Sequence, residues 1–166
     1  MARVFLGLGS NVGDRLQFLQ KAVDELGKTG GVMITKVSRV YETEPVGFVH
    51  QNDFLNLAVE AEVDLKPEAL LLTVKEVEKK VGRTLSERWG PREVDIDILF
   101  YGDHSVQEGD LRIPHPELPK RRFVLVPLQE LDRQLLHPLE RKTVEQLLLH
   151  CPNKSSVRAT ELSVRL

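Results

Sequence analysis

The alternation of apolar and polar positions divides the first part of the chain into strands and helices. Residues 3–10 place Val4, Leu6 and Leu8 on one face, as a half-buried strand does. Apolar residues then recur at helical spacing, which predicts a helix that Gly27 can end. The chain therefore opens with a strand followed by a helix.

Two further strands and a second helix follow. Residues 32–45 are rich in β-branched side chains and predict a strand that Pro45 stops. Residues 53–65 alternate apolar and other side chains and predict the next strand. Pro67 suits the first position of a helix, and the apolar stripe behind it continues to Gly82.

The stretch "ERWGPREVDIDILFYG" (residues 87–102) predicts a strand in its second half. Its periodicity places Val94, Ile96, Ile98 and Phe100 on one face. The other face begins with two aspartates before it also becomes apolar, which is unusual because aspartate is depleted in strands.

The C-terminal part of the chain has a weaker pattern. Residues 113–138 are punctuated by proline and predict irregular structure. Thr143 and Gln146 match a capping box before a last helix over residues 144–149. Cys151 ends this apolar run and is expected to be a buried thiol.

The order strand, helix, strand, strand, helix, strand predicts an α+β fold with a ferredoxin-like core. Helices would pack on an antiparallel sheet, and an irregular C-terminal extension would follow. A length of 166 residues and short connections favour a single domain over residues 1–166. Because this architecture serves many functions, function must be argued from particular residues.

Composition excludes several classes of protein. The net charge of -2 argues against a general nucleic-acid binder, which would normally be basic. No apolar run is long enough to span a membrane, and no signal-peptide pattern is present, so we expect neither a nucleic-acid nor a membrane partner. One cysteine excludes a disulfide framework and favours a cytoplasmic protein.

The glycine-rich stretch "GLGSNVG" (residues 7–13) invites comparison with a dinucleotide-binding fingerprint. The spacing does not match, because Val12 occupies the position of the third glycine. We therefore interpret these glycines as part of a tight turn from strand to helix.

Asp95 and Asp97 are the strongest candidates for chemistry. Residues two apart on a strand share a face, with Cα atoms roughly 6.5 to 7 Å apart, so their carboxylates can converge on a pair of divalent cations. Hard oxygen ligands without histidine or thiolate favour Mg²⁺ over zinc. The alternative is that both side chains simply face water on a half-exposed strand.

Basic residues surround this pair in the sequence. Arg83, Arg88 and Arg92 precede it, and "KRR" at residues 120–122 follows it. Arginine binds phosphate oxygens through two parallel hydrogen bonds, so carboxylates for Mg²⁺ beside arginines for phosphate indicate phosphoryl transfer. Trp89, in a Gly-Pro turn, favours a lid or base-stacking role over a core position.

Three other residues add weaker evidence for a bound ligand. His115 lies between two prolines that fix an extended backbone, which suits a phosphate or ribose contact or simply an exposed histidine. Phe54 and Asn56 lie on the same strand face and could stack on a flat heterocycle and read its amide edge. An ordinary edge-strand asparagine is the alternative.

Taken together, these segments closely resemble the hydroxymethyl-dihydropterin pyrophosphokinase family of folate biosynthesis. The matching segments are "GLGSN" (7–11), "YETEPVG" (41–47), "DFLNLAV" (53–59), "GR" (82–83), "ERWGPREVDIDILFYG" (87–102) and "IPHPEL…RRFVLVPL" (113–128). They cover nearly the whole chain in order, and the combination of "RWGPR", "DxDIL" and "PHP" is highly specific.

The resemblance implies transfer of a pyrophosphoryl group from ATP to the pterin hydroxymethyl group, with release of AMP. Separately, we expect a monomer. Asp95 and Asp97 would bind two Mg²⁺ ions, and Arg83 and Arg92 would hold the triphosphate and act in catalysis. The implied ATP positions are Glu78, Arg83, Trp89, Arg92, Ile98, His115 and Arg121. The implied pterin positions are Thr43, Val46, Phe54, Asn56, Asp95 and Phe123, with the two phenylalanines sandwiching the ring.

Two details depart from some family members. Thr84, Leu85 and Ser86 follow Arg83 where a second arginine can stand, and Phe54 replaces a tyrosine. We expect the loops at residues 45–52 and 83–92 to close over the substrates and exclude water.

Two other classes of function remain open. One is a metal-dependent nucleotidyltransferase or nuclease that uses the same aspartate pair. The other is a ferredoxin-like ligand-binding module without catalysis.

Overall fold

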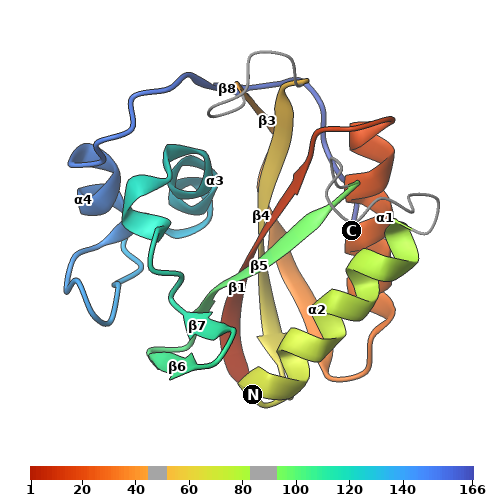
Figure 1. Cartoon of the computed structure of the whole chain (residues 1–166), viewed down its shortest axis with the longest axis horizontal. Helices are drawn as coiled ribbons and strands as arrows, with labels where there is room; N and C mark the ends of the chain where they lie inside the picture. Colours follow the sequence, from red (N-terminus) through yellow and green to blue (C-terminus); the bar gives the residue numbers. More distant parts are fainter. Residues whose placement is uncertain (45–51, 83–92) are drawn as a thin grey trace.

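The fold is built around a six-stranded sheet with helices on both faces (Figure 1). The computed structural model describes residues 1–44, 52–82 and 93–166. The main sheet contains β1 (Ala2–Ser10), β2 (Val32–Val37), β3 (Tyr41–Thr43), β4 (Phe54–Val63), β5 (Asp95–Tyr101) and β8 (Val157–Ala159). Their order is β5-β1-β4-β3-β8, and β2 pairs with the other half of β4. Every pairing in this sheet is antiparallel, which confirms the predicted fold class.

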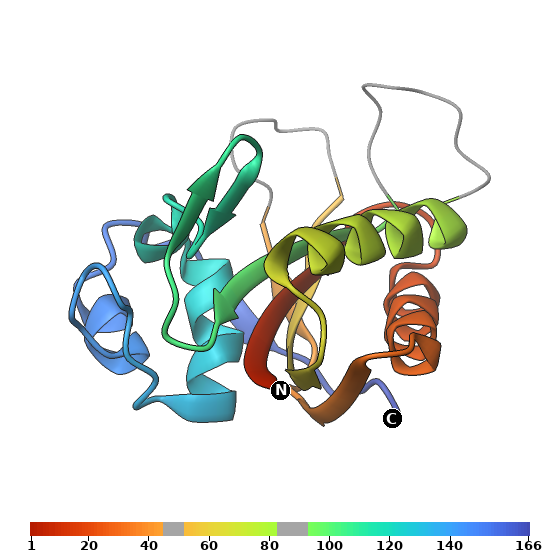
Figure 2. The ribbon, with the colours of Figure 1, turned by 90° about the horizontal axis from the view of Figure 1, so that it is seen from below.

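Two pairs of helices enclose the sheet, as the view from below shows (Figure 2). One face packs against α1 (Arg15–Lys28) and α2 (Pro67–Val81). The other face packs against α3 (Arg122–Asp132) and α4 (Val144–Leu149). A hairpin of β6 (Val106–Glu108) and β7 (Leu111–Ile113), with the short helix η1 (Leu118–Lys120), connects β5 to α3.

The alternation of β1 creates two separate cores. Val4, Leu6 and Leu8 contribute to the core beneath α1 and α2. Phe5 faces the opposite side and packs in the core beneath α3 and α4. Burial on both faces agrees with the place of β1 inside the sheet, where it lies between β5 and β4.

The predicted strand over residues 32–45 is divided into β2 and β3. The break falls at Ser38, whose backbone N–H donates to the Ala58 carbonyl at 2.9 Å. The Ala58 N–H in turn donates to the Ser38 hydroxyl at 2.9 Å. A side chain thus replaces one backbone acceptor and lets the chain change direction while it stays attached to β4.

The face alternation predicted for β5 is correct only for its first part. The pairing of β1 with β5 shifts register between Phe5 and Leu6, which opposes Phe5 to Phe100 but Leu6 to Ile98. This irregularity moves Phe100 to the second core, where its ring packs edge-on against Phe5 at 6.2 Å between centroids.

Helix ends agree with the sequence in most places. Pro67 occupies the first turn of α2, and Gly82 caps its end. Both hydrogen bonds of the predicted capping box are present at the start of α4, and Cys151 is buried. The end of α1 was predicted wrongly, because Gly27 lies inside the helix and Thr29 is its C-cap.

Helix α3 lies inside the proline-punctuated region that was predicted to be irregular. It contains Pro127, which removes one intrahelical donor. Val124, Leu125 and Leu128 are buried in the second core and offset this loss. Packing of an apolar face therefore overrides a local sequence signal that opposes a helix.

The glycines of residues 7–13 do not all belong to the turn that the sequence predicted. Gly7 and Gly9 lie within β1, and neither has a positive φ angle. Only Gly13, with φ of 62°, adopts the left-handed conformation of a turn. Among the residues that the structure describes, no helix has the length and apolarity needed to cross a bilayer.

The docking of α3 can be tested through Leu125, whose side chain is 0% exposed. We expect Leu125→Ala to lower the free energy of unfolding by about 2–5 kcal/mol, because the substitution leaves a cavity in the second core. Urea unfolding followed by circular dichroism measures the change. Leu149→Ala, at a position 74% exposed on α4, should change stability by less than about 0.5 kcal/mol. Equal effects of both substitutions would contradict the packing described here.

Candidate active site

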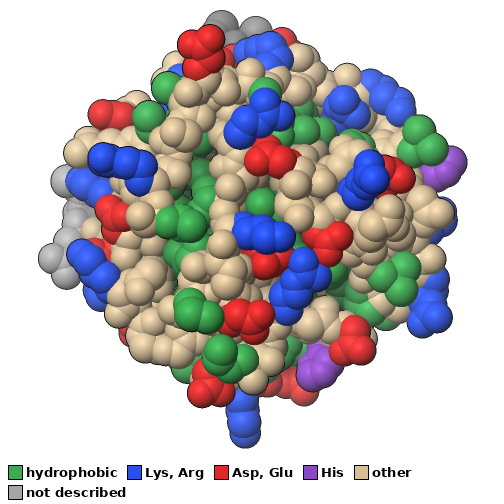
Figure 3. Space-filling view, turned by 180° about the vertical axis from the view of Figure 1, so that it is seen from behind, with side chains coloured by type: hydrophobic (Ala, Val, Ile, Leu, Met, Phe, Trp, Pro, Cys, Tyr) green, Lys and Arg blue, Asp and Glu red, His purple; other side chains and the backbone are tan. Residues whose placement is uncertain are grey.

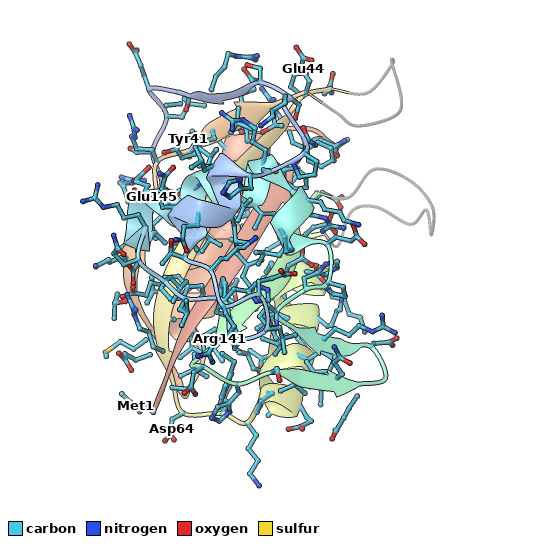
Figure 4. All side chains as sticks on the ribbon, turned by 90° about the vertical axis from the view of Figure 1, so that its left-hand side faces the viewer. Met1, Tyr41, Glu44, Asp64, Arg141 and Glu145 are labelled. Atoms are coloured by element: carbon cyan, nitrogen blue, oxygen red, sulfur yellow. The ribbon has the colours of Figure 1, made fainter. Side chains whose placement is uncertain are left out.

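A cavity of about 570 Å³ opens on the face of the sheet that α3 and α4 leave partly uncovered. Its floor comes from β1, β3, β4 and β5, and the segment from η1 to α3 provides a wall. Figure 4 shows Tyr41 and Glu44 at one end of the sheet, opposite Met1 and Asp64, and Glu44 lines the cavity. The predicted residues that line it are Thr43, Phe54, Asn56, Asp95, Asp97, Arg121 and Phe123.

The two aspartates share the cavity face of β5, as their spacing predicted. Asp95 lies opposite Gly9 of β1, and Asp97 lies opposite Gly7. Both are half-buried, and no β1 side chain stands beside them because the two facing positions are glycines. On their β1 side, the two aspartates therefore adjoin glycine backbone, and the Leu99 side chain lies over Gly7.

The donor atoms at this site fit Mg²⁺ shared with a substrate. Within the described part of the chain, no three histidine, cysteine, aspartate or glutamate side chains are grouped closely enough to hold a metal by themselves. Mg²⁺ commonly keeps several waters and binds through one or two carboxylates plus substrate phosphates. Asp95 and Asp97 are the residues that could supply the protein's share of such a site.

Glu78 and Ile98 lie outside the cavity, on the α2 side of β5. Ile98 is buried in the first core, so any contact with a ligand would have to use its backbone. Glu78 accepts a hydrogen bond of 2.8 Å from the Ile96 N–H and pairs with Lys75 at 3.4 Å. Burial raises the pKa of Glu78, and the charge of nearby Asp95 adds to the increase.

Basic side chains from the η1 segment line part of the cavity, and His115 interacts electrostatically with Asp97 and Arg121 without lining it. Arg121 and Lys120 line the cavity. His115 accepts a hydrogen bond from the Glu117 N–H at its Nδ1 atom, at 3.1 Å, which leaves a proton on Nε2. Burial lowers the pKa of His115, and the positive charge of Arg121 lowers it further. At neutral pH this imidazole is therefore an uncharged hydrogen-bond donor.

The end of the cavity away from the carboxylates combines an amide with aromatic rings. The Asn56 Nδ2 atom donates to the Thr43 hydroxyl at 3.0 Å, and both residues are buried. Phe54 and Phe123 line the cavity, and the Arg121 guanidinium lies 5.9 Å from the centre of the Phe123 ring. This end can take a flat, polar-edged ring.

Ion pairs on the reverse side hold β3 and β4 together near the cavity. Arg15 donates to the Glu42 carboxylate and to the Asp53 carbonyl, each at 2.8 Å. The hydrogen bond from Arg15 lowers the pKa of Glu42. Arg158 of β8 also approaches Glu42 and Asp53. Because Thr43 and Phe54 are the next residues along the chain, these contacts fix the strand register that positions them.

Four predicted site residues, Val46, Arg83, Trp89 and Arg92, lie outside the described residues, as do the two loops expected to close, except for residue 52 of the first loop. The sequence also missed members of the cavity. Asn153 reaches it from the C-terminal extension, and Glu117 reaches it from the segment before η1. No periodicity marks either residue. Gly7 and Gly9 could have been recognised from the sequence, because glycine inside a strand often marks close approach of a ligand.

Comparison with known proteins identifies a family. The family model described as 7,8-dihydro-6-hydroxymethylpterin-pyrophosphokinase (HPPK) matches residues 5–133. The chain is 47% identical over 146 residues to the 2-amino-4-hydroxy-6-hydroxymethyldihydropteridine pyrophosphokinase of Aquifex aeolicus, covering 88% of this chain and 90% of that protein. It is 44% identical over 131 residues to the protein of the same name in Bacillus subtilis, covering 79% and 78%.

Longer proteins contain a similar domain. The bifunctional protein FolKE of Lactococcus lactis subsp. cremoris is 47% identical over 131 residues, and the match spans 38% of its length. The crystal structure of wild-type Plasmodium falciparum HPPK-DHPS superimposes with a TM-score of 0.72 at 16% identity, over 89% of this chain and 44% of that one. At that identity the structural match supports the fold alone.

The raised pKa of Glu78 predicts a pH-dependent loss of stability. Between the unfolded value of about 4.5 and the higher folded value, the folded state binds more protons, so stability falls as pH rises. Glu78→Gln keeps an acceptor for the Ile96 N–H but does not ionise. The unfolding free energy of the wild type minus that of Glu78→Gln should therefore decrease from about pH 4 to about pH 7.

Urea unfolding across this pH range measures the difference. Glu76→Gln, on the exposed side of the same helix, corrects for the loss of one carboxylate. A difference that stays constant or grows with pH would show that burial does not disfavour the charged form of Glu78.

Proposed function

Because the chain belongs to the 7,8-dihydro-6-hydroxymethylpterin-pyrophosphokinase family, we propose that its cavity holds ATP and 6-hydroxymethyl-7,8-dihydropterin together for transfer. The activity is that of an ATP-dependent pyrophosphokinase of folate biosynthesis. The observation that carries the residue assignment is that a single cavity combines two strand carboxylates with a buried amide and two aromatic rings. These groups suit a metal-phosphate and a flat heterocycle, respectively.

The reaction joins the pterin hydroxymethyl oxygen to the β-phosphorus of ATP and breaks the bond from that phosphorus to the oxygen bridging the α-phosphate. That oxygen leaves with AMP, and the alcohol proton is released. Little covalent chemistry falls to the protein, so its contribution is positioning and charge stabilisation. Asp95 and Asp97 would hold two Mg²⁺ ions, which neutralise the phosphate oxygens when bound.

Phosphate binding is assigned to the basic side of the cavity. Arg121 offers a planar, permanently charged donor, and neutral His115 offers its Nε2 proton. Glu78 and Ile98 would contact ATP from behind the edge strand β5, and the family resemblance adds Arg83, Trp89 and Arg92. In this assignment the catalytic residues are Arg83, Arg92, Asp95 and Asp97.

Pterin binding is assigned to the opposite end. Phe54 and Phe123 would stack on the two faces of the ring, which is favourable for a flat π system. Asn56 and Thr43 would hydrogen-bond its amide edge, with Val46 completing the set. Both polar side chains are already ordered by their mutual hydrogen bond of 3.0 Å, which reduces the entropy lost on binding.

Several features favour this proposal over the other two classes. On the face seen in Figure 3, basic and acidic side chains are interspersed, without the basic stripe that a nucleic-acid enzyme would use. A purely ligand-binding module would have no use for paired carboxylates beside a basic wall. We further propose that residues 1–166 act as a single monomeric domain in the cytoplasm, with no nucleic-acid or membrane partner.

Product analysis tests the reaction directly. We expect the protein, mixed with ATP, Mg²⁺ and 6-hydroxymethyl-7,8-dihydropterin, to form AMP and a pterin diphosphate in equal amounts. Chromatography and phosphorus NMR distinguish these from other products. Formation of ADP would place the attack at the γ-phosphorus instead, and a lack of pterin-dependent turnover would leave the acceptor unidentified.

The metal assignment predicts a large effect of Asp97→Asn, which preserves shape but removes a negative ligand. We expect kcat/KM to fall about 100-fold or more, equivalent to about 2.7 kcal/mol, and the Mg²⁺ requirement to rise. Steady-state rates across a Mg²⁺ titration measure both. Asp110→Asn, at an exposed position between β6 and β7, should retain wild-type rates. Turnover retained by a folded Asp97→Asn protein would refute the assignment.

A further inference from the structure

Strand β1, which lies between β4 and β5, carries no side chain between the two functional ends of the cavity. Its register places Gly9 between Asn56 of β4 and Asp95 of β5. In the next row on the same face, Gly7 lies between Ala58 and Asp97. Both glycines line the cavity.

The backbone conformation at Gly9 does not require glycine. Gly9 lies inside a regular strand and is absent from the positive-φ glycines among the described residues. Glycine also weakens a strand, because it adds conformational freedom to the unfolded chain and packs nothing. The reason for glycine at this position must therefore be the space above it.

That space is occupied by the side chain of Asn56. A Cβ atom at Gly9 would lie 2.8 Å from the Asn56 Oδ1 atom, which is closer than real Cβ contacts. The Asn56 amide cannot simply rotate away, because its Nδ2 atom donates a hydrogen bond to the Thr43 hydroxyl and Asn56 is only 6% exposed. The next nearest atoms are the Leu55 carbonyl and a ring carbon of Phe54, both at 3.8 Å.

All three of these neighbours belong to β4, the strand assigned to the pterin, and none belongs to the carboxylate strand. A methyl group at Gly9 would therefore displace the Asn56 amide on one side of β1, whereas it would make only ordinary van der Waals contact with the Phe54 ring. Gly7 differs, because a Cβ there would first meet the Leu99 side chain at 3.2 Å.

We propose that Gly9 is a positioning residue for the pterin substrate. Its bare α-carbon lets the Asn56 amide lie flat across β1, with Oδ1 over Gly9 and Nδ2 held by Thr43. This inference rests on the proposed function, because it takes Asn56 as the group that reads the pterin edge. It adds a determinant of pterin affinity that itself makes no polar contact.

The test compares pterin and nucleotide affinity in Gly9→Ala. The probes are 6-hydroxymethyl-7,8-dihydropterin and α,β-methylene-ATP, whose replaced bridge prevents transfer, measured by calorimetry with Mg²⁺. We expect the Kd for the pterin to rise about tenfold or more, because inserting a methyl group into a filled site is unfavourable enough to weaken binding by that factor. The Kd for the nucleotide should change by less than about threefold. Equal losses for both ligands would overturn the proposal.

A double-mutant cycle identifies Asn56 as the group through which Gly9 acts. In an Asn56→Ala background the Oδ1 atom is gone, so adding Gly9→Ala should change pterin affinity by less than about threefold. An effect as large as in the wild-type background would contradict the proposal. If Gly9→Ala alone does not fold, the double variant should fold with the stability of Asn56→Ala, and failure of both would also contradict it.

Two control variants complete the design. Gly7→Ala adds the same methyl group to the same face and should weaken pterin binding less than Gly9→Ala does. Gly27→Ala, where a Cβ meets no atom within 4 Å, should leave both affinities unchanged. Wild-type protein that does not bind the pterin would refute the proposed function, whereas wild-type binding with an unaffected Gly9→Ala would refute only this inference.

Discussion

The antiparallel pairing of β1 with β4 on one side and β5 on the other is the constraint on which the site depends. The groups assigned to the pterin and to the metal come from segments about 40 residues apart, on strands β4 and β5, which are not hydrogen-bonded to each other. Each is hydrogen-bonded to β1, and that register places Asn56, Gly9 and Asp95 in one row. The relative position of the two groups is thus set by backbone hydrogen bonds.

Incomplete coverage of one face of the sheet explains the unusual composition of β5. At Asp95 and Asp97 this face borders the cavity, Leu99 both lines the cavity and packs in the second core, and Phe100 is covered by that core. The strand therefore begins with carboxylates and becomes apolar on both sides within a few residues. The shift in register contributes to this change from polar to apolar, because it directs both Leu99 and Phe100 into the second core.

The sequence predicted those parts of the molecule whose signals are local. Apolar periodicity identified β1, β4, α1 and α2, and the strand period identified the shared face of Asp95 and Asp97. Helix α3 could not be predicted, because Pro127 opposes it locally and only tertiary packing favours it. Asn153 carries no signal at all, since a distant segment brings it to the cavity. The identity of the acceptor came from family resemblance, because residue chemistry alone indicates only a phosphate and a flat ring.

Gly7 and Gly9 also bear on how one cavity could hold the two substrates proposed for it. Neighbouring strands lie about 4.8 Å apart, so two spacings separate the backbones of Asn56 and Asp95 by roughly 10 Å. The Asn56 amide reaches over Gly9, because that position of β1 carries no side chain. A flat ring read at one edge by this amide would direct its opposite edge toward the carboxylates. A side chain at Gly9 would displace the amide, and with it the ring and the hydroxymethyl group that the proposed reaction brings to the phosphates. Under the proposed function, recognition and reaction would therefore be coupled through a residue that contributes no side chain.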